Sequence, residues 1–233
     1  MIEIRKISNT QLDGVNLYLG LCNGMVSVKK VYARDEKEAE EKVRAAIENS
    51  NTEKEREYLA YIDEHISTVK KVWLALQDRL NGCYWLEDWY YFIINDRINR
   101  HDQSKYDGCE FGGYRQFFYP ENDKEKNSNV FNYSWNHHQK TNDHHWEYWL
   151  LFGDSGKVEA LKMDFPSVIE MLCDWTAMSV KFKNKPSIWF DANKEKMVLH
   201  HDTLQAILHW LPLFDDVYNQ MTAKVVNEKE DKQ

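Results

Sequence analysis

The sequence predicts a mainly α-helical domain preceded by a small α+β segment, and two observations support this fold class. From residue 57 onward, apolar residues recur at helical spacing over most of the chain. Residues 1–50 instead contain short alternating apolar runs followed by one highly charged helical run. We therefore expect an appendage over residues 1–50, an all-α domain over 57–226 and a disordered tail over 227–233.

The first fifty residues are typical of a ββα or βββα unit. Residues 2–7, 15–21 and 25–32 have strand character, and Asn23-Gly24 is a favoured hairpin dipeptide. The segment EKEAEEKVRAAIENS then begins with acidic residues, as the first turn of a helix favours. No catalytic residue types cluster in this unit. We interpret it either as a docking, dimerisation or lid element, and so a candidate contact for a homo-oligomer, or as a packing extension of the main domain.

Helical periodicity and capping signals divide the larger domain into successive helices. Asn81-Gly82 is expected to close the first, Asn142-Asp143 to restart a broken one, and Pro166 to occupy a first turn. Residues 121–129 are predicted to form a charged surface loop. The expected helices cover residues 58–80, 86–100, 110–119, 131–140, 144–151, 166–182, 202–211 and 214–226.

Composition excludes several classes of protein. The net charge of -8 argues against a broad basic face for duplex nucleic acid. No apolar run approaches the ~20 residues of a membrane helix, and the N-terminus lacks the apolar core of a signal peptide, so we expect a cytoplasmic protein. The four cysteines are far apart and form no CxxC pair, which favours reduced thiols with packing roles over a zinc site or disulfides.

Histidine carries the chemical signal, since six of nine histidines fall between His65 and His145. His101-Asp102 offers two neighbouring ligands: imidazole suits Fe, Mn, Zn or Ni, and a carboxylate has two oxygens with which it can bridge two cations. Lys105 follows three residues on, where a helix would place it on the same side as Asp102 and its ammonium could hold a phosphate. An HD dipeptide alone occurs often by chance.

The segment WNHHQKTNDHHWEYW contains two histidine pairs, His137-His138 and His144-His145. Seven or eight residues make about two helical turns, so members of both pairs would share one face of a continuous helix. Adjacent helix positions diverge by ~100°, so one member of each pair is expected to point elsewhere. Four imidazoles this close together predict that at least two bind a metal or a phosphate.

Two carboxylates lie one helical turn apart in the apolar segment VIEMLCDWTAMS. Glu170 and Asp174 would share one face of the expected helix. Either both lie on a solvated stripe, or Asp174 is buried and a cation offsets the cost of its desolvation. The residues alone favour neither interpretation.

Taken in order, these residues reproduce the pattern H…HD…H…HH…D and so resemble the HD-domain superfamily of metal-dependent phosphohydrolases. RHDQSK is similar to the HDxGK segment of its HD-GYP branch, HHWEYW or HHQKTN to its HHE segment, and EMLCDWTAMSVKF to its DxxDAMTSxR helix. The resemblance covers roughly residues 58–210. The GYP triplet is absent, and Ser104 stands where glycine usually precedes the lysine. The resemblance extends to a poorly characterised branch found in phages and bacteria.

The resemblance implies an HD-like helical bundle with two divalent transition metal ions, of Fe, Mn, Ni, Co or Zn, with Mg as a further candidate. His65, His101, Asp102 and Asp174 would hold the first ion. Asp102 would bridge to a second ion, which the histidine pairs would also hold. The ligand from the first pair would be His137 or His138, and the ligand from the second pair would be His144 or His145.

The implied activity is a phosphatase or phosphodiesterase acting on a nucleotide or cyclic (di)nucleotide, with a metal-bridged hydroxide as the nucleophile. Asp102 and Lys105 would be catalytic, Lys105 by stabilising negative charge. Weaker candidates for substrate contacts are Arg97, Arg115, Trp146 and Glu170. Two alternatives remain: a di-iron oxygenase of the same fold, and a non-catalytic protein that binds or sequesters nucleotides.

Overall fold

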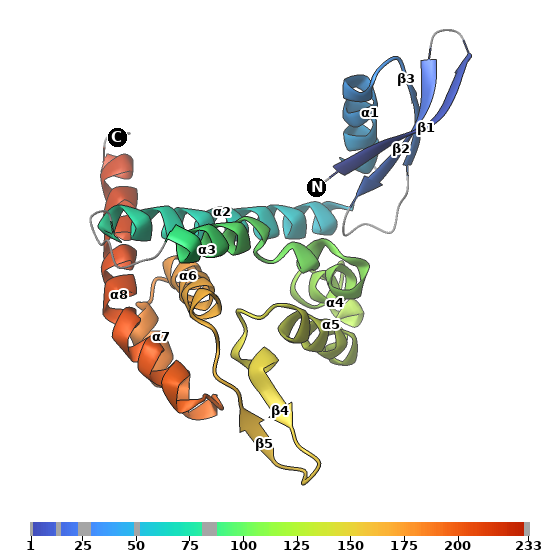
Figure 1. Cartoon of the computed structure of the whole chain (residues 1–233). Helices are drawn as coiled ribbons and strands as arrows, with labels where there is room; N and C mark the ends of the chain where they lie inside the picture. Colours follow the sequence, from blue (N-terminus) through green and yellow to red (C-terminus); the bar gives the residue numbers. More distant parts are fainter. Residues whose placement is uncertain (1, 13–14, 23–28, 49–51, 81–87, 231–233) are drawn as a thin grey trace. The chain divides into compact units, whose positions relative to one another are not determined.

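The computed structural model describes residues 2–12, 15–22, 29–48, 52–80 and 88–230, and within them the protein is mainly helical, as expected (Figure 1). The strands are β1 (Ile2–Leu12), β2 (Val15–Cys22), β3 (Lys29–Ala33), β4 (Leu150–Phe152) and β5 (Val158–Ala160). The α-helices are α1 (Glu36–Glu48), α2 (Glu53–Leu80), α3 (Asp88–Arg100), α4 (Gly108–Phe118), α5 (Ser128–Thr141), α6 (Phe165–Phe182), α7 (Pro186–Asn193) and α8 (His201–Glu230). Short 3-10 helices are η1 (Gln103–Tyr106), η2 (Asp123–Glu125), η3 (Trp146–Trp149) and η4 (Lys194–Lys196).

The chain divides into two compact units, each made of two segments. The first unit combines Met1–Ile62 with Gln103–His138, and the second combines Asp63–Asp102 with Gln139–Gln233. Among the described helices, none has the length and apolar character needed to cross a membrane.

The N-terminal part of the first unit has a βββα order, one of the two orders expected from the sequence. Strands β1, β2 and β3 form an antiparallel sheet in chain order, with Ile2 opposite Cys22 and Asn16 opposite Ala33. Helix α1 lies beside this sheet (Figure 1). Its first turn is capped because Asp35 Oδ1 accepts a hydrogen bond from the Glu38 amide at 2.9 Å. The expected Asn23-Gly24 turn lies outside the described residues, as does the expected helix end at Asn81-Gly82.

Aromatic rings and one close helix approach hold the rest of the first unit together. The Tyr58 ring of α2 lies 5.1 Å from the Phe111 ring of α4 and 6.4 Å from the Tyr114 ring, centroid to centroid. Helices α4 and α5 meet at Gly113. A methyl group on Gly113 would lie only 2.9 Å from the Ser134 Cβ and 3.0 Å from the Val130 carbonyl oxygen. Glycine is therefore needed at this contact.

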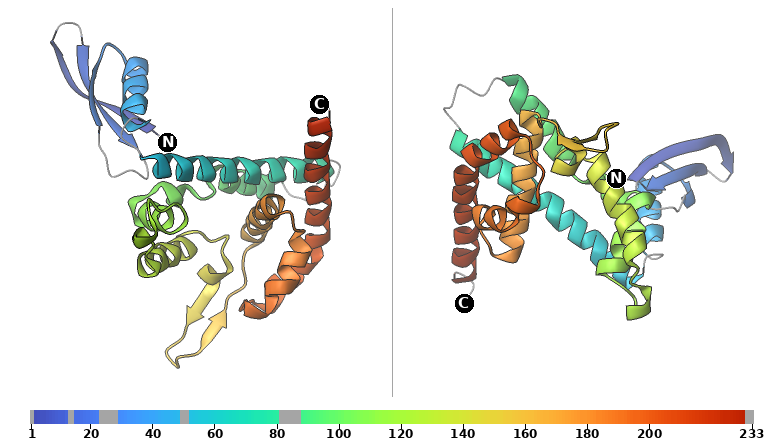
Figure 2. Two further views of the ribbon diagram at one scale, coloured as in Figure 1. Left: turned by 180° about the vertical axis from the view of Figure 1, so that it is seen from behind. Right: turned by 90° about the horizontal axis from the view of Figure 1, so that it is seen from below.

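An apolar core of described residues in the second unit joins α6 to α2, α3, α7 and α8. Figure 2 shows α6, α7 and α8 side by side in both views. Helix α6 begins with Asp164, whose Oδ1 accepts from the Ser167 amide, and Pro166 follows in the first turn as expected. The core consists of Val69, Val72, Trp73, Leu76, Ile94, Ile98, Met163, Val168, Ile169, Met171, Leu172, Cys173, Ala177, Phe190, Ile207, Trp210, Leu211, Phe214 and Val217.

Free thiols occupy the two cysteine positions whose side chains are described. Cys109 is exposed, and Cys173 is buried in the core of the second unit. Burial raises the pKa of the Cys173 thiol well above its ordinary value, so this thiol stays protonated at neutral pH and packs as a small apolar group.

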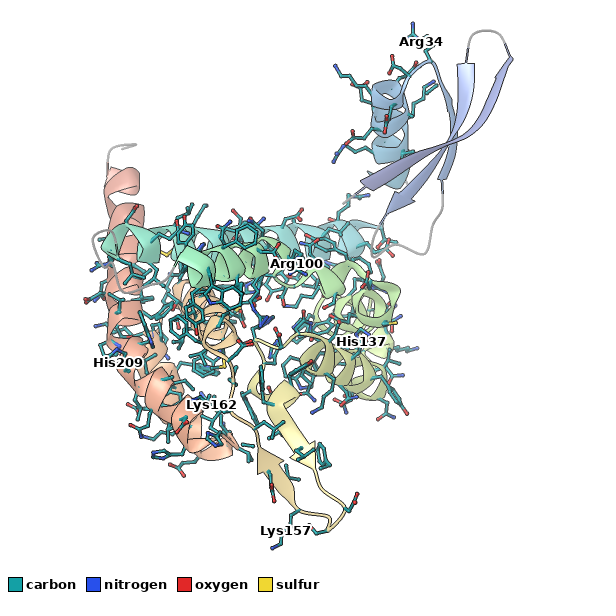
Figure 3. The ribbon with its side chains drawn as sticks, in the orientation of Figure 1. Arg34, Arg100, His137, Lys157, Lys162 and His209 are labelled. Carbon is teal, nitrogen blue, oxygen red and sulfur yellow. The ribbon has the colours of Figure 1, made fainter. Side chains whose placement is uncertain are left out.

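The expectation that residues 57–226 are all helical is wrong at residues 144–160. The expected helix over 144–151 is replaced by a turn, η3 and β4, and β4 pairs with β5 in an antiparallel hairpin. Gly153 and Gly156 close this hairpin, and Gly156 has a positive φ of 76° that favours glycine. These two glycines are the sequence signal that could have indicated the hairpin. Figure 3 marks Lys157 at its tip.

Two further differences concern the C-terminal part. The two helices expected over 202–211 and 214–226 are one helix, α8, with Pro212 inside it. Pro212 cannot donate a backbone hydrogen bond, but the buried apolar stripe that includes Trp210 and Phe214 continues past it. Helix α8 also extends to Glu230, through most of the expected tail. Helix α7 was not anticipated.

The close approach at Gly113 predicts opposite effects of the same substitution at neighbouring positions. Gly113→Ala should lower the free energy of unfolding by about 1–3 kcal/mol, because the methyl group overpacks the α4–α5 contact. Gly112→Ala should raise it by up to about 1 kcal/mol, because nothing lies within 4 Å of the new Cβ and alanine favours a helix. Chemical denaturation of both variants tests this, and equal effects would contradict the packing.

Candidate metal centre

His101 and Asp102 follow directly after α3, at a sharp change in backbone direction. Asp102 has a φ of 57°, a left-handed conformation that aspartate tolerates better than most residues and that commonly ends helices. Both side chains are buried, each residue at 1% relative exposure. Neighbouring residues on a continuing helix would diverge by ~100°, so the turn explains how two adjacent polar side chains both reach the interior.

His65 of α2 and Asp174 of α6 meet these two residues within the second unit. His65 Nε2 lies 3.2 Å from Asp102 Oδ2, 3.1 Å from Asp174 Oδ1 and 3.4 Å from His101 Nε2. His101 Nε2 is 3.5 Å from Asp102 Oδ2 and 3.9 Å from Asp174 Oδ1. Four residues from three separate stretches of the sequence thus turn their ligand atoms toward one point.

The three separations from His65 Nε2, at 3.1, 3.2 and 3.4 Å, suit a common cation, whereas the two from His101 Nε2 to the carboxylates, at 3.5 and 3.9 Å, are longer. Two ligand atoms that each lie about 2.1 Å from one ion are about 3.0–3.4 Å apart in octahedral or tetrahedral geometry. The ligand atoms of His65, His101 and Asp102 meet within 4.8 Å of one another, and all three residues are buried. The described residues therefore contain buried His and Asp groups within metal-binding distance.

A second imidazole group faces the other oxygen of Asp102. His144 is buried in the turn after α5, and its Nε2 lies 3.5 Å from Asp102 Oδ1. Its Nδ1 lies 3.2 Å from Glu170 Oε1, the same oxygen that lies 2.9 Å from His101 Nδ1. Asp102 therefore presents one oxygen to His65 and His101 and the other to His144.

The histidines and carboxylates of this cluster shift one another's pKa values. Burial raises the pKa of Glu170, but the charge of His144 and the hydrogen bond from His101 outweigh it and hold that pKa far below its ordinary value. Burial likewise raises the pKa of Asp174. The hydrogen bond and the charge of His65 outweigh burial and lower that pKa overall. Burial lowers the pKa of His101, yet Asp102 and Glu170 raise it overall. Glu170 and Asp174 stay ionised, so positive charge must accompany them.

Arg97 of α3 ties the His144 turn to α6. Its guanidinium makes a bidentate pair with Asp143 at 2.5 and 2.8 Å and donates to Ser167 Oγ at 2.7 Å. Asp164 Oδ2 lies 3.3 Å from Arg97 Nη2. Trp149 Nε1 also donates to the Asp143 carbonyl at 2.7 Å. Because Asp143 directly precedes His144, these bonds fix the backbone that carries the imidazole.

The other histidine pair belongs to the first unit, where a buried glutamate binds both members. Glu110 of α4 lies with Oε1 2.7 Å from His137 Nδ1 and Oε2 2.8 Å from His138 Nδ1. His138 is buried, whereas His137 is half-exposed and is labelled on α5 in Figure 3. Lys105 of η1 lies with Nζ 6.0 Å from the centre of the Tyr114 ring.

The members of each histidine pair differ in burial but do not point to separate places. His138 is buried and His137 is half-exposed, yet both rings contact Glu110. His144 contacts Glu170 and Asp102, and a ring nitrogen of His145 also lies within 4.8 Å of ligand atoms of His144 and Asp102. The expectation that one member of each pair points elsewhere is therefore not supported by these contacts. The two pairs do not share one helix, because α5 ends at Thr141.

Four expected substrate contacts have other surroundings. Arg97 pairs with carboxylates of its own unit, and Arg115 of α4 pairs with Glu125 and donates to the Tyr119 carbonyl. Trp146 packs against the apolar core, and Glu170 is buried against His101 and His144. Charge alone suggested phosphate contacts for the two arginines, but their guanidinium groups are already engaged by carboxylates of the chain.

Two carboxylates that contact the imidazoles, Glu110 and Glu170, were not expected in that role from the sequence. Glu110 was expected only as part of a helix, and Glu170 as a substrate contact. The available signal for Glu170 was its position one turn before Asp174 on an apolar helix. For Glu110 no local pattern marks its contact with His137 and His138, which are 27 and 28 residues away.

Comparison with family models identifies the class of the chain. Residues 54–212 match a family of unknown function, DUF5662, so the chain belongs to that family. No curated protein and no solved structure is significantly similar to the chain. The family match spans His65, His101, Asp102, His144 and Asp174.

The contacts of Glu110 with His137 and His138 predict that Glu110 contributes to the free energy of unfolding at neutral pH and less in acid. Burial raises its pKa, but hydrogen bonds and charge from His138, with a further bond from His137, lower it overall. A carboxylate with a lowered folded pKa stabilises the protein above its unfolded pKa of about 4.5 and loses this effect as the pH falls through the folded value. Glu110→Gln should lower the free energy of unfolding by about 1–3 kcal/mol at pH 7.

Denaturation of wild type and Glu110→Gln between pH 7 and pH 3.5 tests this expectation. The difference between them should shrink below about pH 4.5, since protonated glutamate resembles glutamine. Exposed Glu40→Gln is the control and should show little difference at any pH. A Glu110→Gln difference that grows as the pH falls would contradict the assignment.

Proposed function

We propose that the chain is a metal-dependent phosphohydrolase of the HD type, acting on a nucleotide or cyclic (di)nucleotide phosphoester. The observation that supports it is the arrangement around Asp102: one oxygen faces His65 and His101 and the other faces His144. Asp174 completes the first group at 3.1 Å from His65. This is the order and grouping of residues that the HD resemblance implies for two cations with a shared aspartate.

The donor set also fits the proposed ions chemically. Imidazole and carboxylate together suit Fe, Mn, Co, Ni or Zn. Three carboxylates packed against three imidazoles need compensating charge, and a divalent cation supplies it without protonating the ligands. When bound, such cations would polarise the phosphoryl group and activate a water molecule.

The protein's own groups then have distinct roles in the proposal. Asp102 would hold both cations, and the left-handed backbone at this residue directs its carboxylate inward beside His101. Lys105, assigned by its match to the lysine of the HDxGK segment, stabilises negative charge on the phosphoryl oxygens. The nucleotide class rests on the same resemblance and on the aromatic residues near the histidines in sequence.

Two variants separate metal binding from chemistry. Asp102→Asn should lower metal content and turnover together, because the amide keeps the side-chain shape and the left-handed backbone but loses the charge and the bridge. Lys105→Ala should keep its metal and lose about 10²–10³ in kcat, the usual cost of one charge-stabilising donor. Elemental analysis and a phosphatase and phosphodiesterase panel with Mn, Fe, Co, Ni, Zn and Mg measure both.

The same panel tests the alternatives. Wild-type protein that lacks activity with every metal and binds nucleotides tightly would contradict the hydrolase and support a sequestering protein. Bound iron with a mixed-valence signal and oxygen consumption would support the oxygenase. Full activity of Lys105→Ala on all active substrates would remove Lys105 from the catalytic set.

A further inference from the structure

Glu170 lies against the two imidazoles that face opposite oxygens of Asp102. Its Oε1 atom is 2.9 Å from His101 Nδ1 and 3.2 Å from His144 Nδ1. The Nε2 atoms of the same rings lie 3.5 Å from Asp102 Oδ2 and 3.5 Å from Asp102 Oδ1, respectively. Each ring therefore has Glu170 at its Nδ1 edge and Asp102 at its Nε2 edge. The two ring centroids are 4.4 Å apart.

A neutral imidazole carries one N–H, and its position decides which nitrogen can bind a cation. A carboxylate that accepts from Nδ1–H fixes the tautomer with the lone pair on Nε2 and holds the ring in one orientation. We propose that Glu170 is a positioning residue shared by two metal positions, because one oxygen orients one imidazole ligand of each. This inference rests on the proposed function, since it assumes that His101 and His144 bind cations.

The surroundings of Glu170 suit a residue that orients the histidines rather than one that contacts a substrate. The side chain is buried on α6, one turn before Asp174. Arg97 Nη1 lies 3.9 Å from Glu170 Oε2 and also pairs with Asp143, the residue before His144. Arg97 therefore holds both the carboxylate and the backbone of one imidazole that the carboxylate orients. Its guanidinium also compensates part of the buried negative charge.

Because one glutamate orients both rings, its loss should affect both metal positions, whereas loss of one histidine should affect only one. Loss of His144 removes a ligand of one position and leaves His65, His101, Asp102 and Asp174 in place. Loss of Glu170 releases both rings, so both positions should weaken together. Removing such an outer carboxylate typically costs about 10–100-fold in metal affinity.

Titration of metal-free protein with Co²⁺ tests the inference, with cobalt per chain and the visible absorption of bound cobalt as readouts. Wild type should bind two ions. His144→Ala should keep one ion with near wild-type affinity, whereas Glu170→Ala should lose about 10–100-fold in affinity for both. Glu170→Gln should lose less at both positions, because its amide oxygen still accepts from both Nδ1–H groups.

Thr176→Val is the matched control. Thr176 is buried on the same helix, and its hydroxyl donates to the Leu172 carbonyl of that helix at 2.7 Å rather than to the histidine cluster. This variant should bind two ions like wild type. Far-ultraviolet circular dichroism and unfolding midpoints of all variants show whether each remains folded.

The outcomes separate this inference from the proposed function. Wild type that binds two ions, with Glu170→Ala weakened at one position or at neither, overturns the shared support and leaves the metal proposal standing. Equal losses in Thr176→Val and Glu170→Ala also overturn it, since the cause would then be disturbance of α6. Wild type that binds no Co²⁺ overturns the proposed function itself, and this inference with it.

Discussion

Burial of carboxylates beside imidazoles is the constraint around which the second unit is organised. Asp102, Glu170 and Asp174 lie on or beside helices whose other residues form the apolar core. An ionised carboxylate removed from water is costly unless positive charge and hydrogen bonds compensate it. The side chains that contact these carboxylates are His65, His101, His144 and Arg97. The core fixes the backbones, and the paired charges fix the directions of the side chains.

Helix α6 contributes residues both to the apolar core and to the cluster of histidines and carboxylates. One side contributes Ile169 and Leu172 to the core, while Glu170 and Asp174 reach the histidines. Its start is tied to α3 through Arg97, which contacts Asp164 and Ser167, and to the His144 turn through Asp143. Disturbance at any of these residues would therefore affect the positions of the clustered histidines and carboxylates as well as packing.

The sequence supports the prediction of helical segments better than of their ends and contacts. Strong apolar periodicity predicted α2, α3 and α6. A helix that buries one face needs apolar residues at helical spacing, so this spacing in the sequence indicates the helix. The hairpin of β4 and β5 was missed because each strand has three residues, too few for a period to show. A helix break was expected near Pro212, but packing of α8 on either side outweighs one missing hydrogen bond.

The candidate site was predictable as a set of residue types but not as a geometry. The order of His65, His101, Asp102 and Asp174 predicted that these residues act together, and the fold brings their side chains together. The roles of Glu110 and Glu170 depend on contacts across tens of residues, which spacing does not encode. The orientation of His101 and Asp102 depends on the left-handed backbone at Asp102, which an HD dipeptide alone does not reveal.

Whether the histidines and carboxylates around Asp102 bind two cations can be measured by anomalous X-ray scattering from crystals of the Mn²⁺-loaded protein, on both sides of the manganese edge. We expect one manganese bound by His65, His101, Asp102 and Asp174, and a second on the other oxygen of Asp102 beside His144. A cluster without manganese, with the carboxylates and imidazoles bonded only to one another at saturating Mn²⁺, would contradict it.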